Sequence, residues 1–240
     1  MNDRCDRINS YKWQMFLPLL FTFHFSLFTS SCTTDAYEKG EGEYSLLRGD
    51  FVEASSNANS ELVSMTTDDG DLLPFIQPYS DKWVTTADST YRCMLYYNKV
   101  KDTQGKDAAE IVSIAPVPCP VVKPLSEFDM ELRTDPVKFN SIWVSKSGKY
   151  LNLYLQLKTG STDDASAVQK LAVVTDTLLQ HSDGTLTRHL ILHHDQGGVP
   201  EYYSTAAYLS IPLAAMDADS IRFSIHSYSG LVIKTLSIRQ

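Results

Sequence analysis

The sequence predicts an all-β protein built from two strand-rich blocks. From residue 61 onward, short apolar or alternating runs are separated by turn-forming residues, with little helical periodicity. The clearest run is YLNLYLQLK, in which leucine occupies every second position from Leu151 to Leu157. A period of two with one apolar face is typical of a half-buried strand. Frequent Gly-containing turns between such runs favour hairpins over parallel units.

The first block, residues 61–128, contains two predicted hairpins. ELVSMTT and DLLPFIQ flank a turn at Gly70, and residues 91–99 and 110–117 flank a polar segment that turns near Gly105. The strip PVPCPVVKP then has four prolines in nine residues. Because proline donates no backbone hydrogen bond, we expect this strip at an edge or in a connector.

The second block, residues 129–240, alternates more regularly. About seven strands follow one another with turns at Gly148, Gly184 and Gly230, which is the count expected of a β-sandwich. The one helix that the pattern predicts is short, IPLAAMDAD at residues 211–219. We expect the boundary between the two blocks at residues 128–129.

Residues 1–31 have the composition of a signal peptide. Basic residues near the start precede an almost uncharged run from Met15 to Phe28, which is shorter than a bilayer-spanning helix. Small polar residues then lead to Cys32, an arrangement that resembles a bacterial lipoprotein signal, in which the cysteine receives the lipid. Thr29 departs from that motif, which usually has leucine there. The alternative is an ordinary cleaved signal with an incidental cysteine.

Residues 32–60 are rich in Glu, Asp, Ser, Gly and Asn. Such a stretch buries too little apolar surface to offset its ordering entropy, so we expect a flexible tether. The whole chain has a net charge of −8, and removing residues 1–31 makes it one unit more negative. An acidic surface repels phosphate backbones, so we expect no nucleic-acid partner.

Four cysteines are present. Cys5 lies in the signal segment and Cys32 is the candidate lipidation site, which leaves Cys93 and Cys119. In an oxidising envelope these two could form a disulfide, and a hairpin turning near Gly105 would place them nearly opposite each other. Two free thiols are the alternative.

The histidines near residue 190 form the most suggestive polar cluster. His189, His193, His194 and Asp195 offer metal-binding groups, but His193 and His194 point to opposite faces of a strand, and His189 and His193 are about 13 Å apart. We therefore expect solvent-facing histidines, no metal site and no cofactor. Aspartates around Gly70 lack the spacing of a calcium loop.

The sequence contains none of the common catalytic motifs for nucleophilic, zinc-dependent or nucleotide-dependent chemistry. We therefore expect a protein that is not an enzyme. Paired tyrosines, such as Tyr96 and Tyr97, are expected to place one ring in the core and one outside.

Several features together resemble the NigD-like lipoproteins of Bacteroidetes. Cys32 leads a polar tether, TTDDGDLLPF opens the first block, and DPVKFNSIWVSKSGKYLNLYLQL and RHLILHHD follow in the second. The resemblance spans residues 32–240 and implies an N-terminal OB-like small barrel followed by a C-terminal β-sandwich. It carries no catalytic residues. A role in bacteriocin immunity is suggested for the family by its operon context.

Three tripeptides resemble the O-glycosylation motif of Bacteroidetes, an Asp followed by Ser or Thr and a small or apolar residue. Their acceptors would be Ser89, Thr177 and Ser220.

These observations predict a non-catalytic outer-membrane lipoprotein, palmitoylated at Cys32, that contacts the membrane through its anchor and binds a protein or glycan partner. It could face the periplasm or the cell surface. The alternative function is a glycan-binding accessory or a carbohydrate-active protein. A cleft with convergent carboxylates or a row of exposed rings would favour that alternative.

Overall fold

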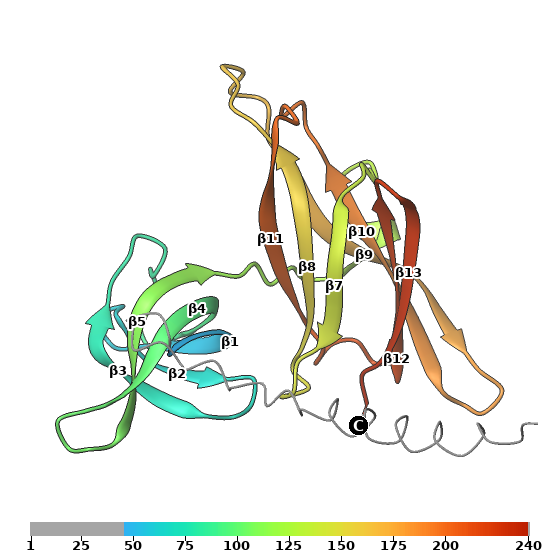
Figure 1. The fold of residues 1–240 in the computed structure, drawn as a ribbon. Helices are drawn as coiled ribbons and strands as arrows, with labels where there is room; N and C mark the ends of the chain where they lie inside the picture. Colours follow the sequence, from blue (N-terminus) through green and yellow to red (C-terminus); the bar gives the residue numbers. More distant parts are fainter. Residues whose placement is uncertain (1–45, 240) are drawn as a thin grey trace, which may run out of the picture. The chain divides into compact units, whose positions relative to one another are not determined.

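The computed structural model describes residues 46–239. They form thirteen strands and one three-residue 3-10 helix, η1 (Leu125–Glu127). The strands belong to a closed barrel followed by a two-sheet sandwich, which confirms the predicted all-β fold (Figure 1).

The barrel contains the first five strands in the order β1-β2-β3-β5-β4. A closed five-stranded barrel is the architecture expected of an OB-like domain. Both predicted hairpins are present, and their glycines at the turns have positive φ, +89° at Gly70 and +77° at Gly105. The strands of the barrel are β1 (Leu47–Ser56), β2 (Leu62–Thr67), β3 (Leu72–Tyr79), β4 (Thr90–Lys101) and β5 (Asp107–Pro116).

Alternating side chains of these strands fill the barrel. Val52 and Ala54 of β1 meet Leu62 and Met65 of β2 and Leu95 of β4, and all five are fully buried. Apolar residues at every second position therefore close the barrel around one small core.

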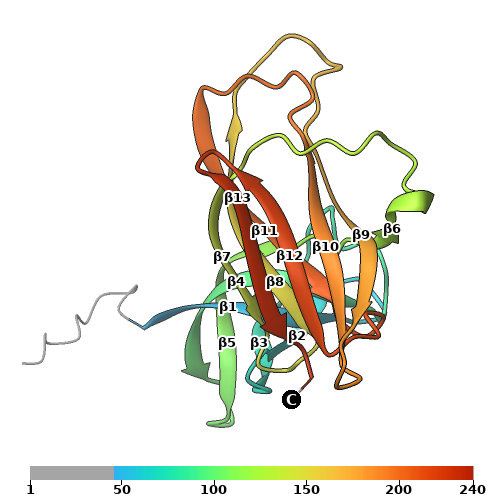
Figure 2. The same cartoon turned by 90° about the vertical axis from the view of Figure 1, so that its right-hand side faces the viewer.

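The sandwich consists of a five-stranded sheet, β13-β12-β10-β9-β6, and a three-stranded sheet, β11-β8-β7 (Figures 1 and 2). Within the larger sheet, β10 and β12 run parallel, because β11 between them belongs to the other sheet. The strands are β6 (Lys123–Pro124), β7 (Lys138–Val144), β8 (Tyr150–Thr159), β9 (Lys170–Gln180), β10 (Leu186–Asp195), β11 (Tyr203–Pro212), β12 (Ser220–Ser227) and β13 (Gly230–Ser237).

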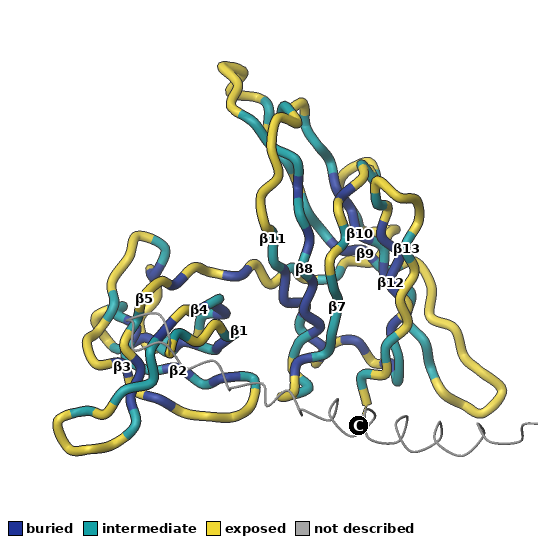
Figure 3. The backbone as a smooth tube through the Cα atoms, viewed as in Figure 1, coloured by how far each residue is buried: buried dark blue, intermediate teal, exposed yellow. Residues whose placement is uncertain are grey.

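The core of the sandwich lies between these two sheets. The leucines of β8 face inward as their spacing predicts, and they pack with Phe223 and Ile225 of β12. Buried segments of the tube in Figure 3 coincide with the middles of the facing strands. The alternation in the sequence therefore identifies the buried face correctly.

Three expectations about the chain's organisation need correction. The predicted tether extends too far, because residues 47–56 form β1, whose Val52 and Ala54 enter the barrel core. The sandwich begins before residue 129, because β6 already pairs with β9. Residues 211–219 form no helix: β11 ends at Pro212 and a turn leads to β12.

The predicted signal peptide, residues 1–31, and Cys32 lie outside the described residues. Within residues 46–239, no helix is long and apolar enough to cross a membrane.

Shortening a core leucine should destabilise the protein strongly. Leu155 is fully buried between the sheets, so Leu155→Ala should lower the free energy of unfolding by about 2–5 kcal/mol through lost contacts and a cavity. Urea denaturation followed by circular dichroism measures this. Leu179→Ala, at a side chain on β9 that is 52% exposed, is the matched control and should stay within about 0.5 kcal/mol of the wild type. Equal losses in both variants would contradict the assigned core.

Candidate functional site

Arg92 of β4 connects the barrel to the sandwich through one buried guanidinium group. Its Nη1 and Nη2 donate to the two carboxylate oxygens of Asp68 at 2.7 and 2.8 Å. Its Nε donates to Ser210 Oγ on β11, and Nη2 donates to Asn152 Oδ1 on β8, both at 3.2 Å. The Arg92 side chain is 2% exposed, so these groups replace the water that it would otherwise contact.

A buried charge is tolerated only when it is paired and its donors are satisfied. The bidentate bond to Asp68 neutralises the charge, and Ser210 Oγ donates to Asn152 Oδ1 at 2.7 Å to complete the network. The ring of Tyr150 lies 4.2 Å from the guanidinium carbon and adds a cation–π contact. Residues of both domains are therefore needed to hold Arg92.

A second polar contact lies beside the first. Glu53 of β1 accepts hydrogen bonds from Lys149 Nζ at 2.7 Å and from the Tyr150 hydroxyl at 2.9 Å. Burial alone would raise the pKa of Glu53, but these two hydrogen bonds outweigh it and hold the pKa below its usual value. Burial and the hydrogen bond to Glu53 raise the pKa of Tyr150 to about 12. Glu53 is therefore a fixed anion and Tyr150 a fixed donor.

Aromatic rings form the apolar part of the junction. Phe51 of β1 makes edge contacts with Trp143 of β7 and Tyr208 of β11, with ring centroids 5.6 and 5.5 Å apart. Tyr208 also stacks on Tyr154 at 4.8 Å. Edge and offset-stacked rings are favoured geometries, so Phe51 is packed specifically against the outer face of the three-stranded sheet.

Two clefts border this junction. One, of about 700 Å³, has a mostly apolar lining without charged side chains, and the other, of about 520 Å³, contains several carboxylates. The larger cleft is lined by Met94, Tyr96, Ser113, Ala115, Pro116, Val117, Pro118, Cys119, Pro120, Leu171, Ala206, Ala207, Tyr208 and Leu209. We call it the apolar cleft.

The carboxylates of the smaller cleft are largely engaged by neighbours. Asp50 accepts the Tyr97 hydroxyl at 3.0 Å, Asp68 binds Arg92, and Asp69 lies 2.8 Å from Lys146 Nζ. Glycosidic hydrolysis needs one carboxyl free to protonate the leaving group and another to act as base or nucleophile. The observed pairing does not favour the carbohydrate-active alternative.

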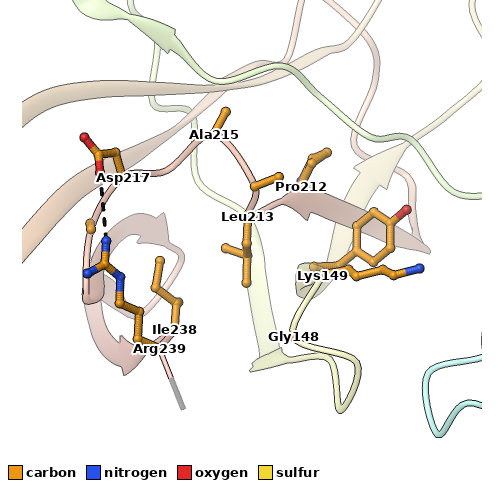
Figure 4. Close-up of a pocket in the computed structure, with 11 residues that line it drawn as sticks. Gly148, Lys149, Pro212, Leu213, Ala215, Asp217, Ile238 and Arg239 are labelled. Carbon is orange, nitrogen blue, oxygen red and sulfur yellow. Dashed lines mark ion pairs between the residues drawn. The ribbon is translucent and has the colours of Figure 1, made fainter.

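A third hollow, of about 830 Å³, lies at the end of the sandwich (Figure 4). Leu213 and Ala215 from the turn after β11 and Ile238 from the chain end contribute apolar surface. Arg239 pairs with Asp217 across a distance of 3.9 Å, as the dashed line in Figure 4 marks. The charged residues of this lining, Lys149, Asp217 and Arg239, all take part in ion pairs, so the hollow favours contact with a partner over proton transfer.

The two candidate disulfide cysteines are both free thiols in this structure. Cys93 pairs with Pro116 across the β4–β5 hairpin. Cys119 therefore lies three residues beyond the position directly opposite Cys93. Burial raises the pKa of Cys93 to about 12, which makes it a poor nucleophile, whereas Cys119 is exposed. The disulfide stays a prediction.

The expectation of solvent-facing histidines is wrong for His193 and His194, which are each 1% exposed. The backbone N–H of Arg133 donates to His193 Nδ1 at 3.1 Å, and the His194 Nδ1 lies 2.9 Å from the Asp135 carbonyl. The segment before β7 therefore covers both rings. Among the described residues, no group of three or more His, Cys, Asp or Glu is arranged to hold a metal ion.

His189 lies between two polar partners on the outer face of the larger sheet. Its Nδ1 is 2.8 Å from Asp176 Oδ1 and its Nε2 is 2.7 Å from Ser224 Oγ. This is the connectivity of a Ser-His-Asp triad. Ser224, however, is buried in the middle of β12, with paired strands on both sides, so the neighbouring backbone amides are committed to the sheet and leave no oxyanion hole.

The candidate glycosylation residues have three different environments. Thr177 is exposed on β9, Ser89 is half-buried in a loop, and the Ser220 hydroxyl lies 2.7 Å from Thr187 Oγ1. Their modification stays a prediction. The expected division of paired rings holds for Tyr97, which is buried, and Tyr96, which is 40% exposed.

Sequence reasoning missed Arg92 and its partners. The available signals were a charged residue inside the strand YRCMLYY and a polar asparagine inside YLNLYLQL. Neither signal says which residues meet.

The comparisons with known proteins agree with this architecture. Residues 120–238 match the family model of the NigD-like C-terminal beta sandwich domain. A NigD-like immunity protein from Bacteroides caccae is 25% identical, with a TM-score of 0.61 over 78% of this chain and 91% of its own. The chain belongs to the NigD-like family.

Two further solved structures share the fold of this NigD-like protein. A protein of unknown function from Bacteroides vulgatus is 14% identical, with a TM-score of 0.59 over 81% of this chain and 92% of its own. A proposed lipoprotein from Bacteroides fragilis is 9% identical, with a TM-score of 0.56 over 81% and 99%. A comparison with curated proteins gave no match.

Removing the guanidinium group should destabilise the junction. Arg92→Ala leaves the half-buried Asp68 carboxylate without its cation and removes one hydrogen-bond partner from each of the buried Asn152 and Ser210, so the free energy of unfolding should fall by about 3–5 kcal/mol in urea denaturation. Arg222→Ala, at an exposed arginine of β12, is the control and should change it by less than about 0.5 kcal/mol. A loss no greater than that of the control would exclude a structural role for Arg92.

The buried His193 should make the protein sensitive to mild acid. Burial lowers the pKa of His193 below its ordinary value of 6.5, so below about pH 6.5 the unfolded state binds a proton that the folded state does not. Stability should therefore fall as the pH drops from 7 toward 5. His193→Gln should reduce this slope in urea titrations at several pH values, whereas Gln180→Ala, at an exposed and non-titrating residue of β9, should leave it unchanged. An unaltered slope in His193→Gln would refute the assignment.

Proposed function

We propose that this NigD-like chain is a non-catalytic cell-envelope lipoprotein, anchored at Cys32, whose β domains bind a protein partner in the manner of an immunity protein. The observation that carries the proposal is the 25% identity to the Bacteroides caccae immunity protein over 78% of the chain. The fold is also similar to that of a proposed lipoprotein of Bacteroides fragilis, which supports a location in the cell envelope.

The geometry of the junction supports binding over catalysis. The titratable groups between the domains are paired, as Arg92 is with Asp68 and Glu53 is with Lys149. A catalytic acid or base must be free to exchange a proton at the operating pH. The junction instead holds rigid surfaces beside open clefts, which is what a docking partner needs.

The signal-like segment and Cys32 support the anchor. A single acyl chain gives only marginal membrane binding, whereas two or more chains anchor a protein stably. A lipid-modified N-terminal cysteine of the bacterial type would therefore keep the β domains at the membrane, where a bacteriocin aimed at the envelope would meet them. Either face of the outer membrane agrees with this proposal.

Loss of Cys32 should remove both the lipid and the protective effect. In a Bacteroides strain that lacks the gene, wild-type protein should incorporate an alkynyl palmitate analogue and restore growth beside bacteriocin-producing strains. Cys32→Ala should incorporate no label and restore growth poorly, because the protein is no longer held at the membrane. Labelling is read by click chemistry, and protection by the diameter of the inhibition zone.

Thr235→Ala is the matched control, since it changes an exposed residue of β13 that lines neither cleft beside the junction, and it retains Cys32. It should behave as the wild type in both assays. Label that persists in Cys32→Ala would refute the anchor. The immunity role would be refuted if the inhibition zones had equal diameters in strains with and without the wild-type gene, beside every bacteriocin-producing strain.

A further inference from the structure

Strand β11 ends the three-stranded sheet, and most of its outer edge has no strand partner among the described residues. It pairs with β8 on one side along its whole length. On the other side, the Ser210 N–H donates to the Pro118 carbonyl at 3.0 Å. In an antiparallel strand, alternate residues direct their N–H and C=O to the same side, so Ser204, Ala206 and Tyr208 face this open edge as well.

The edge of β11 lacks the protection that edge strands usually have. Natural sheets discourage unwanted pairing with charged side chains, especially lysine, or with proline. The other edge strands of the sandwich follow this rule, with Lys234 in β13, Lys138 in β7, and Lys123 followed by proline in β6. The sequence of β11, YSTAAYLSIP, has no charged residue, and its proline is the last residue.

The apolar cleft runs along this same edge. Four consecutive residues of β11, Ala206 to Leu209, line it, although neighbours on a strand point to opposite faces. A cleft that touches both faces follows the edge of the strand itself. Met94 and Tyr96 of the barrel line it too, and it measures about 700 Å³. Its lining has no charged side chain.

The connector between the domains already uses one end of this edge. Its Pro118 carbonyl accepts from Ser210, but Pro116, Pro118 and Pro120 have no N–H to return a bond. The connector therefore cannot extend the sheet further along β11. The hydrogen bond from Ser210 to Pro118 is therefore the end of the occupied part of this edge. From Ser210 toward Tyr203 the edge is open to pairing with another strand.

We propose that an extended, uncharged and apolar segment of a protein partner adds to β11 as a fourth strand and places a side chain in the apolar cleft. This inference rests on the proposed function in that it takes the partner to be a protein. Backbone pairing would supply affinity, and the tyrosine- and proline-lined cleft would supply selectivity. Because the cleft is lined by the barrel as well as by β11, it accommodates one strand better than the sheet of a second copy.

A heptapeptide phage-display library panned against residues 33–240 tests the proposal. The selected pool should be enriched in uncharged, apolar sequences without helical spacing. A synthetic peptide from that pool should bind Ala206→Lys at least tenfold more weakly than the wild type. Thr235→Lys, which adds the same charge on the exposed β13, is the matched control and should bind as the wild type does.

Hydrogen exchange identifies the strand that is used. Bound peptide should slow exchange at the amides of Ser204, Ala206 and Tyr208, which face the open edge. The amides of Thr205 and Ala207, which already pair with β8, should be unchanged. A pool without enrichment, equal binding to Ala206→Lys, or slowing confined to another strand would overturn the proposal.

The protection assay separates this inference from the proposed function. Full-length Ala206→Lys should protect cells less well than Thr235→Lys. If it protects as well as the wild type, the β11 edge is not where the partner docks, and the immunity role still stands. If even the wild type gives no protection, the immunity role fails, and the peptide and exchange experiments still decide whether β11 accepts a strand.

Discussion

The buried guanidinium group of Arg92 is the constraint on which the junction of the two domains depends. It cannot remain charged away from water unless Asp68, Asn152 and Ser210 are all present. Those partners come from the barrel and from two neighbouring strands of the sandwich. The hydrogen bonds of Arg92 therefore determine which part of the β11-β8-β7 sheet contacts the barrel. The positions of the two clefts beside the junction follow from this contact.

Much of the fold follows from local sequence pattern. The leucine period of β8 and the glycine turns of the two barrel hairpins identify strands and their buried faces directly. Composition does not identify β1, because its buried Val52 and Ala54 lie among Asp, Glu and Ser and the segment resembles a tether. A closed barrel accepts such a strand, because only its inward-facing residues must be apolar and hydrogen bonds from both neighbours hold the backbone.

The polar junction could not be predicted in the same way. Arg92 lies 24, 60 and 118 residues from Asp68, Asn152 and Ser210, and a single sequence gives no information about contacts at such separations. The prediction that His193 and His194 face solvent is wrong for the same reason. Strand periodicity correctly indicates that His193 and His194 point to opposite faces, but it cannot reveal that residues 133–135 cover them. Burial by a distant segment is a property of the tertiary fold.

Tyr208 links the junction to the proposed docking edge. Its ring contacts Phe51 of the barrel and Tyr154 of β8, its backbone faces the open side of β11, and it lines the apolar cleft. A strand added at β11 would therefore meet a residue that the barrel already holds in place. Preorganisation of this kind lowers the entropy cost of binding, because the receptor surface does not need to be ordered by its ligand. The barrel thus has a physical role in recognition even if the partner's backbone pairs only with the sandwich.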